Sequence, residues 1–193
     1  MKRTGLASAF CLLLAASWPS GPSVADPLHK FGNEGAWVHV DSGWVFPKDV
    51  GSFARVTQPY NIDGNNDAGV EYRQASGLRA EVEIYAADSA AAGATLDGAK
   101  NNAALKAGES AHIESEKPFS VDALNDASGV KVTYVANGKP AGTLTNLYFF
   151  TTDRWRIKVL ASTQGPGKDD DLALDAFVQA LPWITLGTDP GLH

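Results

Sequence analysis

The sequence predicts an α+β fold, an antiparallel β-sheet built from hairpins with two helices packed on one side. Residues 69–73 and 78–85 alternate apolar and polar side chains with a period of two, and their charges fall on one face. This alternation is typical of an antiparallel sheet with one face in water. A stretch with helical features follows each of two strand-rich blocks. The predicted order is therefore strands, helix, strands, helix.

The first block of strands is expected after a loose lead-in over residues 26–36. Residues 37–40 and 44–47 are short strand candidates, and Pro47 ends the second. Residues 50–56 are a weaker candidate. The alternating hairpin follows, with its turn at residues 75–77, where small and flexible residues favour a reversal of the chain.

The first helix is expected to begin at Asp88 or Ser89, whose side chains suit an N-cap, and to run to about Ala107. Gly108 is the expected stop, because glycine readily adopts the left-handed conformation that ends many helices. The segment is rich in alanine and has few large apolar residues. We therefore expect it to lie on a surface that accommodates small side chains.

The second block contains the longer strands, with candidates at residues 111–115, 119–121, 130–135, 143–151 and 155–159. The last helix opens at Asp169, Asp170 and Asp171, because acidic side chains interact favourably with the positive end of the helix dipole. Apolar residues then recur at helical spacing up to Pro182, namely Leu174, Phe177, Val178 and Leu181.

Residues 1–25 predict a cleavable signal peptide. Lys2 and Arg3 give it a positive start, residues 6–16 form an apolar stretch too short to span a bilayer, and small residues stand at the cleavage positions before Asp26. An uncleaved N-terminal membrane anchor is the alternative. The mature protein is therefore expected to be soluble, periplasmic or secreted, and not inserted in the membrane.

The remaining chain predicts a single α+β domain over residues 37–186 and a C-terminal tail over residues 187–193. Cys11, the only cysteine, lies in the signal peptide, so we expect a mature chain without disulfides or cysteine metal ligands. Loss of Lys2 and Arg3 changes the formal charge from −6 to −8, with 14 basic and 22 acidic residues. This acidity argues against nucleic acid as a partner, because such partners are bound by neutralising phosphates.

The order of elements resembles the α+β domains grouped as Mog1/PsbP-like. The resemblance rests on Trp44-Val45-Phe46-Pro47 near the start, on the hairpin of residues 70–85, and on the long strand pair of residues 144–160 before a terminal helix. It covers most of the mature chain, in layout more than in motifs. The resemblance implies a non-enzymatic accessory or partner-binding role. It implies no catalytic residue, because that family has no shared site.

Motifs of common enzyme classes do not occur in the sequence. There is no Gly-x-Ser-x-Gly turn, no phosphate-binding loop, no His-Glu-x-x-His and no dinucleotide fingerprint. The four histidines are scattered and do not suggest a zinc site: His29, His39, His112 and His193. We therefore expect no cofactor.

A weak calcium candidate consists of Asp63, Asn65 and Asp67, which place oxygen ligands at alternate positions. Ala68 and Gln74 stand where a calcium loop needs a glycine and a bidentate glutamate. The same residue types are what a tight turn between strands requires. A turn is therefore the favoured interpretation.

Charged residues of the hairpin and nearby aromatic residues are weak binding candidates. The charged ones share one predicted face: Glu71, Arg73, Arg79, Glu81 and Glu83. Gathered carboxylates serve as acid and nucleophile in glycosidases, but a solvated, charge-paired face is favoured because alternation alone predicts it. The aromatic ones are Trp37, Trp44 and Phe46, for which core packing is favoured over an exposed ligand patch.

The function expected from these observations is that of an exported, soluble, non-enzymatic binding or accessory domain. It would act through surface contacts with an unknown protein or small ligand. One alternative is a small extracytoplasmic hydrolase with a carboxylate-based site. Another is an inhibitor or immunity-type protein that blocks a secreted enzyme.

Overall fold

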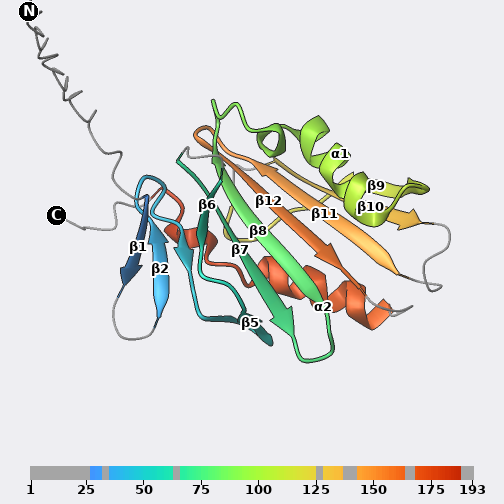
Figure 1. Ribbon diagram of the computed structural model, residues 1–193, viewed down its shortest axis with the longest axis horizontal. Helices are drawn as coiled ribbons and strands as arrows, with labels where there is room; N and C mark the ends of the chain where they lie inside the picture. The colour runs from blue at the N-terminus through green and yellow to red at the C-terminus, as the bar shows by residue number, and fades with distance from the viewer. Residues whose placement is uncertain are drawn as a thin grey trace, which may run out of the picture.

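The computed structural model describes residues 27–31, 35–62, 66–124, 128–136, 143–163 and 168–187. Within them, a nine-stranded antiparallel sheet has the order β4-β5-β7-β8-β12-β11-β10-β9, and β6 also pairs with β7 (Figure 1). Its strands are β4 (Asp49–Val50), β5 (Phe53–Arg55), β6 (Tyr60–Ile62), β7 (Asp67–Gln74), β8 (Arg79–Ala86), β9 (Ala111–Pro118), β10 (Ser128–Ala136), β11 (Leu144–Thr151) and β12 (Trp155–Ser162). The predicted signal peptide and residues 188–193 of the predicted tail lie outside the described residues.

The predicted hairpin is formed by β7 and β8. Their register pairs Val70 with Val82 and Glu71 with Glu81. Both valines are completely buried, whereas the two glutamates lie half-buried on the opposite face. The period-two pattern of the sequence therefore sets which face each side chain occupies.

The two strand blocks meet along β8 and β12. Strand β12 pairs with β8 over the full length of both strands, although α1 and three further strands separate them in the chain. Strands β12, β11, β10 and β9 then continue the sheet as antiparallel neighbours. Six of the eight residues in each of β11 and β12 are buried, on both faces of the sheet.

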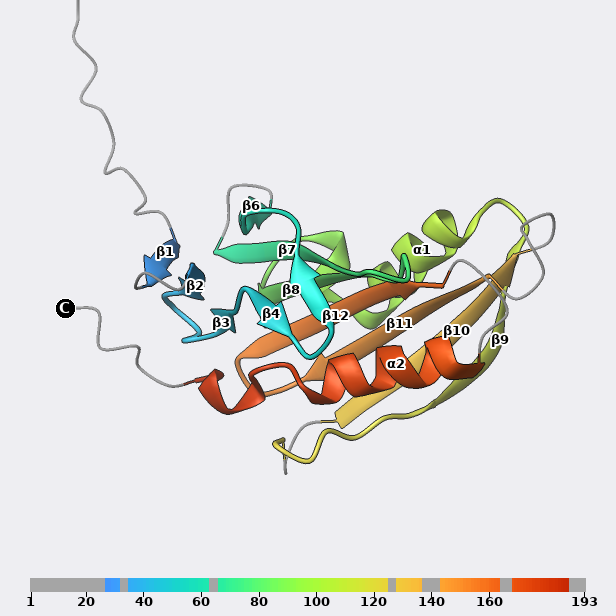
Figure 2. The ribbon, with the colours of Figure 1, turned by 90° about the horizontal axis from the view of Figure 1, so that it is seen from below.

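Helices α1 (Leu96–Ala107) and α2 (Lys168–Gln179) cover opposite faces of this sheet (Figures 1 and 2). On β11, Leu147 and Phe149 belong to the core beneath α1, whereas Tyr148 and Phe150 belong to the core beneath α2. The predicted class, an antiparallel sheet of hairpins with two helices packed on it, is confirmed. The helices do not share one side, because the central strands are apolar on both faces and each face needs a cover.

Helix α1 begins later than the sequence predicted. Thr95 is its N-cap, and the Thr95 hydroxyl accepts a 3.1 Å hydrogen bond from the Gly98 N–H. Ser89 instead donates to the buried carboxylate of Asp67, and a short 3₁₀ turn, η1 (Ala92–Ala94), precedes the helix. Gly108 ends α1 as predicted, with φ of 125° in the region that favours glycine.

Alanines form the sheet-facing side of α1. Ala99, Ala103 and Ala107 are buried and pack with Leu147 and Leu160 of the sheet. Their small side chains let the helix lie close to the strands, as the composition of the segment predicted. Helix α2 uses larger residues, and its Leu174, Phe177 and Val178 enter the main core.

A second, three-stranded sheet consists of β1 (Leu28–Phe31), β2 (Ala36–His39) and β3 (Val45–Phe46). Strand β1 lies within the segment that the sequence predicted to be a loose lead-in. It is ordered by antiparallel pairing with β2, the next strand in the chain, and its four residues are too few to show a strand pattern of their own. The chain closes on this sheet with η2 (Trp183–Thr185), where the Trp44 and Trp183 rings meet edge to face at 5.1 Å.

Two further strands differ from expectation. Strand β9 covers residues 111–118 and so extends the candidate at 111–115, whereas the candidate at 119–121 is wrong because those residues form no strand. Strand β6 was not predicted. Both are largely exposed and lie at or beside sheet edges, so they lack the apolar alternation by which strands are recognised.

Candidate functional site

The register of the sheet arranges side chains on the α1 face in rows that cross the strands. One row contains Arg79 on β8, Ser162 on β12 and Thr145 on β11, which are direct register partners. The next row contains Glu81, Leu160 and Leu147. Because neighbouring strands lie about 4.8 Å apart, each row brings residues that are distant in sequence within reach of one small molecule.

A cleft of about 400 Å³ opens over these two rows, beside the C-terminal end of α1. It is lined by Glu71, Arg79, Glu81, Lys106, Thr143, Thr145, Leu160, Ala161, Ser162 and Thr163. Charged and hydroxyl groups dominate this lining, and Leu160 is its large apolar member. Helix α1 packs on β9, β10 and β11, and Arg79 at the start of β8 is exposed to solvent.

Glu81 is held in its ionised form within the cleft. Its Oε1 accepts a 2.7 Å hydrogen bond from the Tyr60 hydroxyl, and Lys106 Nζ donates to its Oε2. Burial by itself raises the pKa of Glu81, but the hydrogen bonds from Lys106 and Tyr60 outweigh it and leave the pKa below its usual value. Glu81 is therefore an anion and a hydrogen-bond acceptor at neutral pH, and not a source of protons.

Gly69 allows Tyr60 to reach Glu81. The Tyr60 ring lies directly on Gly69, where a Cβ atom would stand 2.7 Å from the ring carbon Cζ. A close approach of this kind needs a residue without a side chain. Burial, followed by the hydrogen bond to Glu81, raises the pKa of Tyr60, so the phenol remains a proton donor to the carboxylate.

Arg79 is the cation of the cleft without a partner. It is exposed, and within the described part of the chain no carboxylate lies within ion-pair distance of its guanidinium. The other charged groups nearby are already engaged, Glu81 with Lys106 and Glu71 with Arg73 at 3.4 Å. The guanidinium of Arg79 is therefore free to bind an added anion.

The next charged row on the α1 face is closed. Glu83 and Lys158 are register partners that form an ion pair, with side-chain exposures of 10% and 4%. The Tyr85 hydroxyl donates to Glu83 at 2.6 Å, and Gly93 of η1 lies against that hydroxyl. Glu83, a sequence candidate for binding, thus joins a buried structural pair and does not line the cleft.

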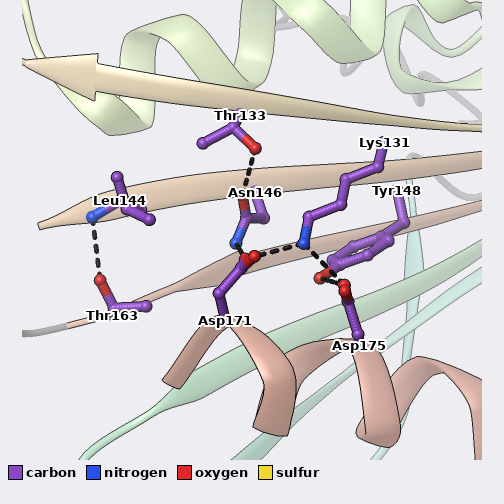
Figure 3. Close-up of polar contacts among 8 residues, drawn as sticks. All are labelled: Lys131, Thr133, Leu144, Asn146, Tyr148, Thr163, Asp171 and Asp175. Atoms are coloured by element: carbon purple, nitrogen blue, oxygen red, sulfur yellow. Dashed lines mark hydrogen bonds and ion pairs between the residues drawn. The ribbon is translucent and has the colours of Figure 1, made fainter. Parts of the chain in front are cut away.

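A polar network joins the other face of the sheet to α2 (Figure 3). Lys131 Nζ donates to Asp171 Oδ1 and to Asp175 Oδ1, both at 2.7 Å. Asn146 donates to Asp171 at 2.8 Å, and the Tyr148 hydroxyl donates to Asp175 at 2.6 Å. Burial, followed by the bond to Asp175, raises the pKa of Tyr148.

This network fixes the position of α2. The Lys131 side chain is only 1% exposed, so a ligand in solvent has no access to its ammonium group. Asp171 and Asp175 are one helical turn apart and both face the sheet, so the lysine ties the start of α2 to β10. The charges are arranged for packing and orientation, and not for contact with a substrate.

The structure places the remaining sequence candidates away from the cleft. Trp44 and Phe46 are completely buried in the main core, and Trp37 packs against that core while partly exposed. Asp67 is buried and accepts hydrogen bonds from the Ala86 N–H at 3.0 Å and from Ser89. The other two members of the calcium candidate, Asp63 and Asn65, lie outside the described residues.

His39 is a buried, neutral histidine. Its Nε2 donates to the Asn66 carbonyl at 2.8 Å, so its Nδ1 accepts from the Ser42 hydroxyl at 2.7 Å. Burial lowers the pKa of His39, against smaller opposing effects of the Asn66 carbonyl and of Asp41 and Asp67. His39 therefore has a structural role in the three-stranded sheet, in which both of its ring nitrogens are hydrogen-bonded.

Sequence reasoning found part of the cleft and missed the rest. Glu71, Arg79 and Glu81 were candidates, whereas Tyr60, Lys106, Thr145 and Ser162 were not. Hydroxyl residues in strands and a lysine in the last turn of a helix are common, so their sequence carries no sign of a site. Among the described residues, no group of histidine, cysteine and acidic side chains is placed to hold a metal ion, and no helix is long and apolar enough to cross a membrane.

Comparison with known proteins adds no assignment to this geometry. No model of a protein family matches the chain, and no curated protein matches it in sequence.

Proposed function

We propose that this chain is an exported, non-enzymatic binding domain that takes a small polar molecule in the cleft beside α1. The observation that carries the proposal is the cleft itself, about 400 Å³ in volume and lined by several hydroxyl groups and by Arg79, which has no ion-pair partner among the described residues. Its volume lies within the range of about 300–1,000 Å³ that is usual for small-molecule sites.

The chemistry of the lining favours binding over catalysis. A hydroxyl nucleophile needs an adjacent base, and no histidine is among the residues that line the cleft in the described part of the chain. Glu81 is engaged by both Tyr60 and Lys106 and is kept ionised. The lining thus offers charges and hydrogen bonds to a ligand. A binding or accessory role also accords with the resemblance in layout to Mog1/PsbP-like domains.

The test is a thermal-shift screen of the mature protein against a library of small anionic, cationic and neutral metabolites. A ligand at 100 times its Kd stabilises the folded state by about 2.7 kcal/mol. For a domain of this size, that corresponds to an increase in Tm of roughly 5–10 °C. Ser162→Phe would fill the cleft and should abolish the shift. Ser115→Phe, at an exposed position of β9, is the matched control and should preserve it. Absence of any shift with the wild-type protein would refute ligand binding in the cleft.

A carboxylate-based hydrolase is the second candidate. It is favoured by one observation, since Glu71 and Glu81 are register partners at the cleft. The Cβ atoms of such a pair lie about 5 Å apart, a spacing from which two carboxyl groups can adopt the separation of about 5–5.5 Å found in retaining glycosidases. Turnover of chromogenic glycosides by the wild-type protein, lost in both Glu71→Gln and Glu81→Gln, would favour this candidate over simple binding.

A further inference from the structure

The free charge in the cleft determines which ligand it suits. Lys106 and Glu81 neutralise each other, as do Arg73 and Glu71. Arg79 remains as a single positive charge without a partner among the described residues. A ligand with one negative charge would therefore complete the charge balance of the cleft.

Hydroxyl groups accompany Arg79 along its row. Ser162 is its direct register partner, and Thr145 is the partner of Ser162 on the next strand. Within the described part of the chain, neither of these two hydroxyls has a hydrogen-bond partner. A guanidinium offers a planar fork of N–H donors that matches a carboxylate, and two hydroxyl donors beside it extend the same recognition.

The surroundings discriminate between anions. Glu71 and Glu81 lie in the adjacent row, about 7 Å farther along the strands. Both carboxylates are already paired, so Arg79 alone would compensate the charge of a ligand, and a doubly charged phosphate would keep one uncompensated negative charge. Leu160 lies in the same adjacent row and gives the cleft an apolar surface for the body of the ligand.

From these contacts we propose that the cleft binds a small organic carboxylate with a short apolar body, whose carboxylate contacts Arg79, Ser162 and Thr145 and whose body lies on Leu160. This inference rests on the proposed binding function and names the class of ligand for the same cleft.

The experiment measures backbone amide NMR shifts of the mature protein during titration with straight-chain carboxylates from acetate to octanoate. The matched primary amides, the matched amines and inorganic phosphate serve as comparison probes. Carboxylates are expected to shift the amide signals of β8, β12 and the start of β11. The Kd of each neutral amide should be at least about tenfold higher than that of the matched carboxylate, because the amide carries no negative charge to interact with the guanidinium of Arg79.

Two variants locate the carboxylate. Arg79→Gln should weaken carboxylate binding by about tenfold or more and leave the weak binding of the amides nearly unchanged. Arg154→Gln is the matched control, since Arg154 is an exposed arginine that precedes β12 at the end opposite to Ser162. It should leave carboxylate binding intact. Amide spectra and urea unfolding establish that both variants are folded.

The outcomes separate this inference from the proposed function. Tighter binding of amines, amides or phosphate than of carboxylates would overturn the ligand class and leave a binding function standing. Carboxylate binding that survives in Arg79→Gln would overturn the location. If no carboxylate binds, the ligand class is refuted. If the metabolite library also gives no thermal shift, the proposed function fails with it.

Discussion

Replacement of Lys131 by methionine tests how α2 is held on the sheet. Methionine has nearly the same length and keeps the apolar packing, but it removes the ammonium group that bridges Asp171 and Asp175 at 2.7 Å each. Among the described residues, the two carboxylates would then keep side-chain donors from Asn146 and Tyr148 alone.

The magnitude follows from the exposure of the three groups. Removing one partner of a fully buried ion pair costs about 3–5 kcal/mol. Lys131 is 1% exposed, but the Asp171 and Asp175 side chains are 31% and 27% exposed and retain some contact with water. We therefore expect a loss just below that range, about 2–3 kcal/mol in the free energy of unfolding. For a domain of this size, such a loss lowers Tm by roughly 5–10 °C.

Urea unfolding followed by tryptophan fluorescence measures this difference. Lys117→Met, which removes an exposed lysine of β9, is the control and should change the free energy of unfolding by less than about 0.5 kcal/mol. Adding Asp175→Asn to Lys131→Met leaves one carboxylate in place of two, so the double variant should be more stable than Lys131→Met alone. A Lys131→Met protein as stable as the wild type, or a double variant less stable than the single one, would show that the network does not hold α2.

Three further predictions concern His39, Glu81 and Gly69. His39 has a lowered pKa in the folded state, so the free energy of unfolding of the wild type should decrease as the pH falls below about 6.5. Urea unfolding at pH 7.5 and at pH 5.5 measures this decrease, which should be smaller in His39→Gln. Glu81 also has a lowered pKa, so its contribution is present above about pH 4.3 and lost as the pH falls through the lower folded-state pKa. In Glu81→Gln, the free energy of unfolding should therefore fall less steeply with pH on the acid side than in the wild type. An unchanged pH dependence would contradict a lowered pKa of Glu81. Gly69→Ala should displace the Tyr60 ring and lower the free energy of unfolding by about 1 kcal/mol, as measured by urea unfolding. The same substitution should have little effect in a Tyr60→Ala background, where the ring is already absent.

The local pattern was sufficient for most of the large sheet. The alternation of residues 69–73 and 78–85 predicted the hairpin of β7 and β8, and the apolar runs predicted β10, β11 and β12. The stop at Gly108 and the acidic start of α2 also followed from local chemistry, because capping depends on residues within one turn. Strands β1 and β6 were not predicted, because each is short and is ordered by antiparallel pairing with the next strand in the chain. The start of α1 at Thr95 was not predicted, because Ser89 binds Asp67 and does not cap the helix.

The candidate site was predicted only in part. Alternation placed Glu71, Arg79 and Glu81 on one face, and the register confirms that arrangement. The alternation did not predict three other pairings. Glu83 is buried with Lys158, Lys106 reaches Glu81 from α1, and Ser162 lies beside Arg79. Each of these depends on β12 returning to β8 across the whole second block of strands.

The sequence by itself determined the class of fold, the face that each strand residue occupies and most helix ends, because these depend on side-chain periodicity and on capping within a few residues. Only the tertiary structure decided that the helices cover opposite faces and which charges are paired. It also decided that Arg79 lines a cleft without an ion-pair partner among the residues that the structure describes. Those properties depend on strand order and on where α1 stops above the sheet. Both are set by packing between segments that are distant in the chain.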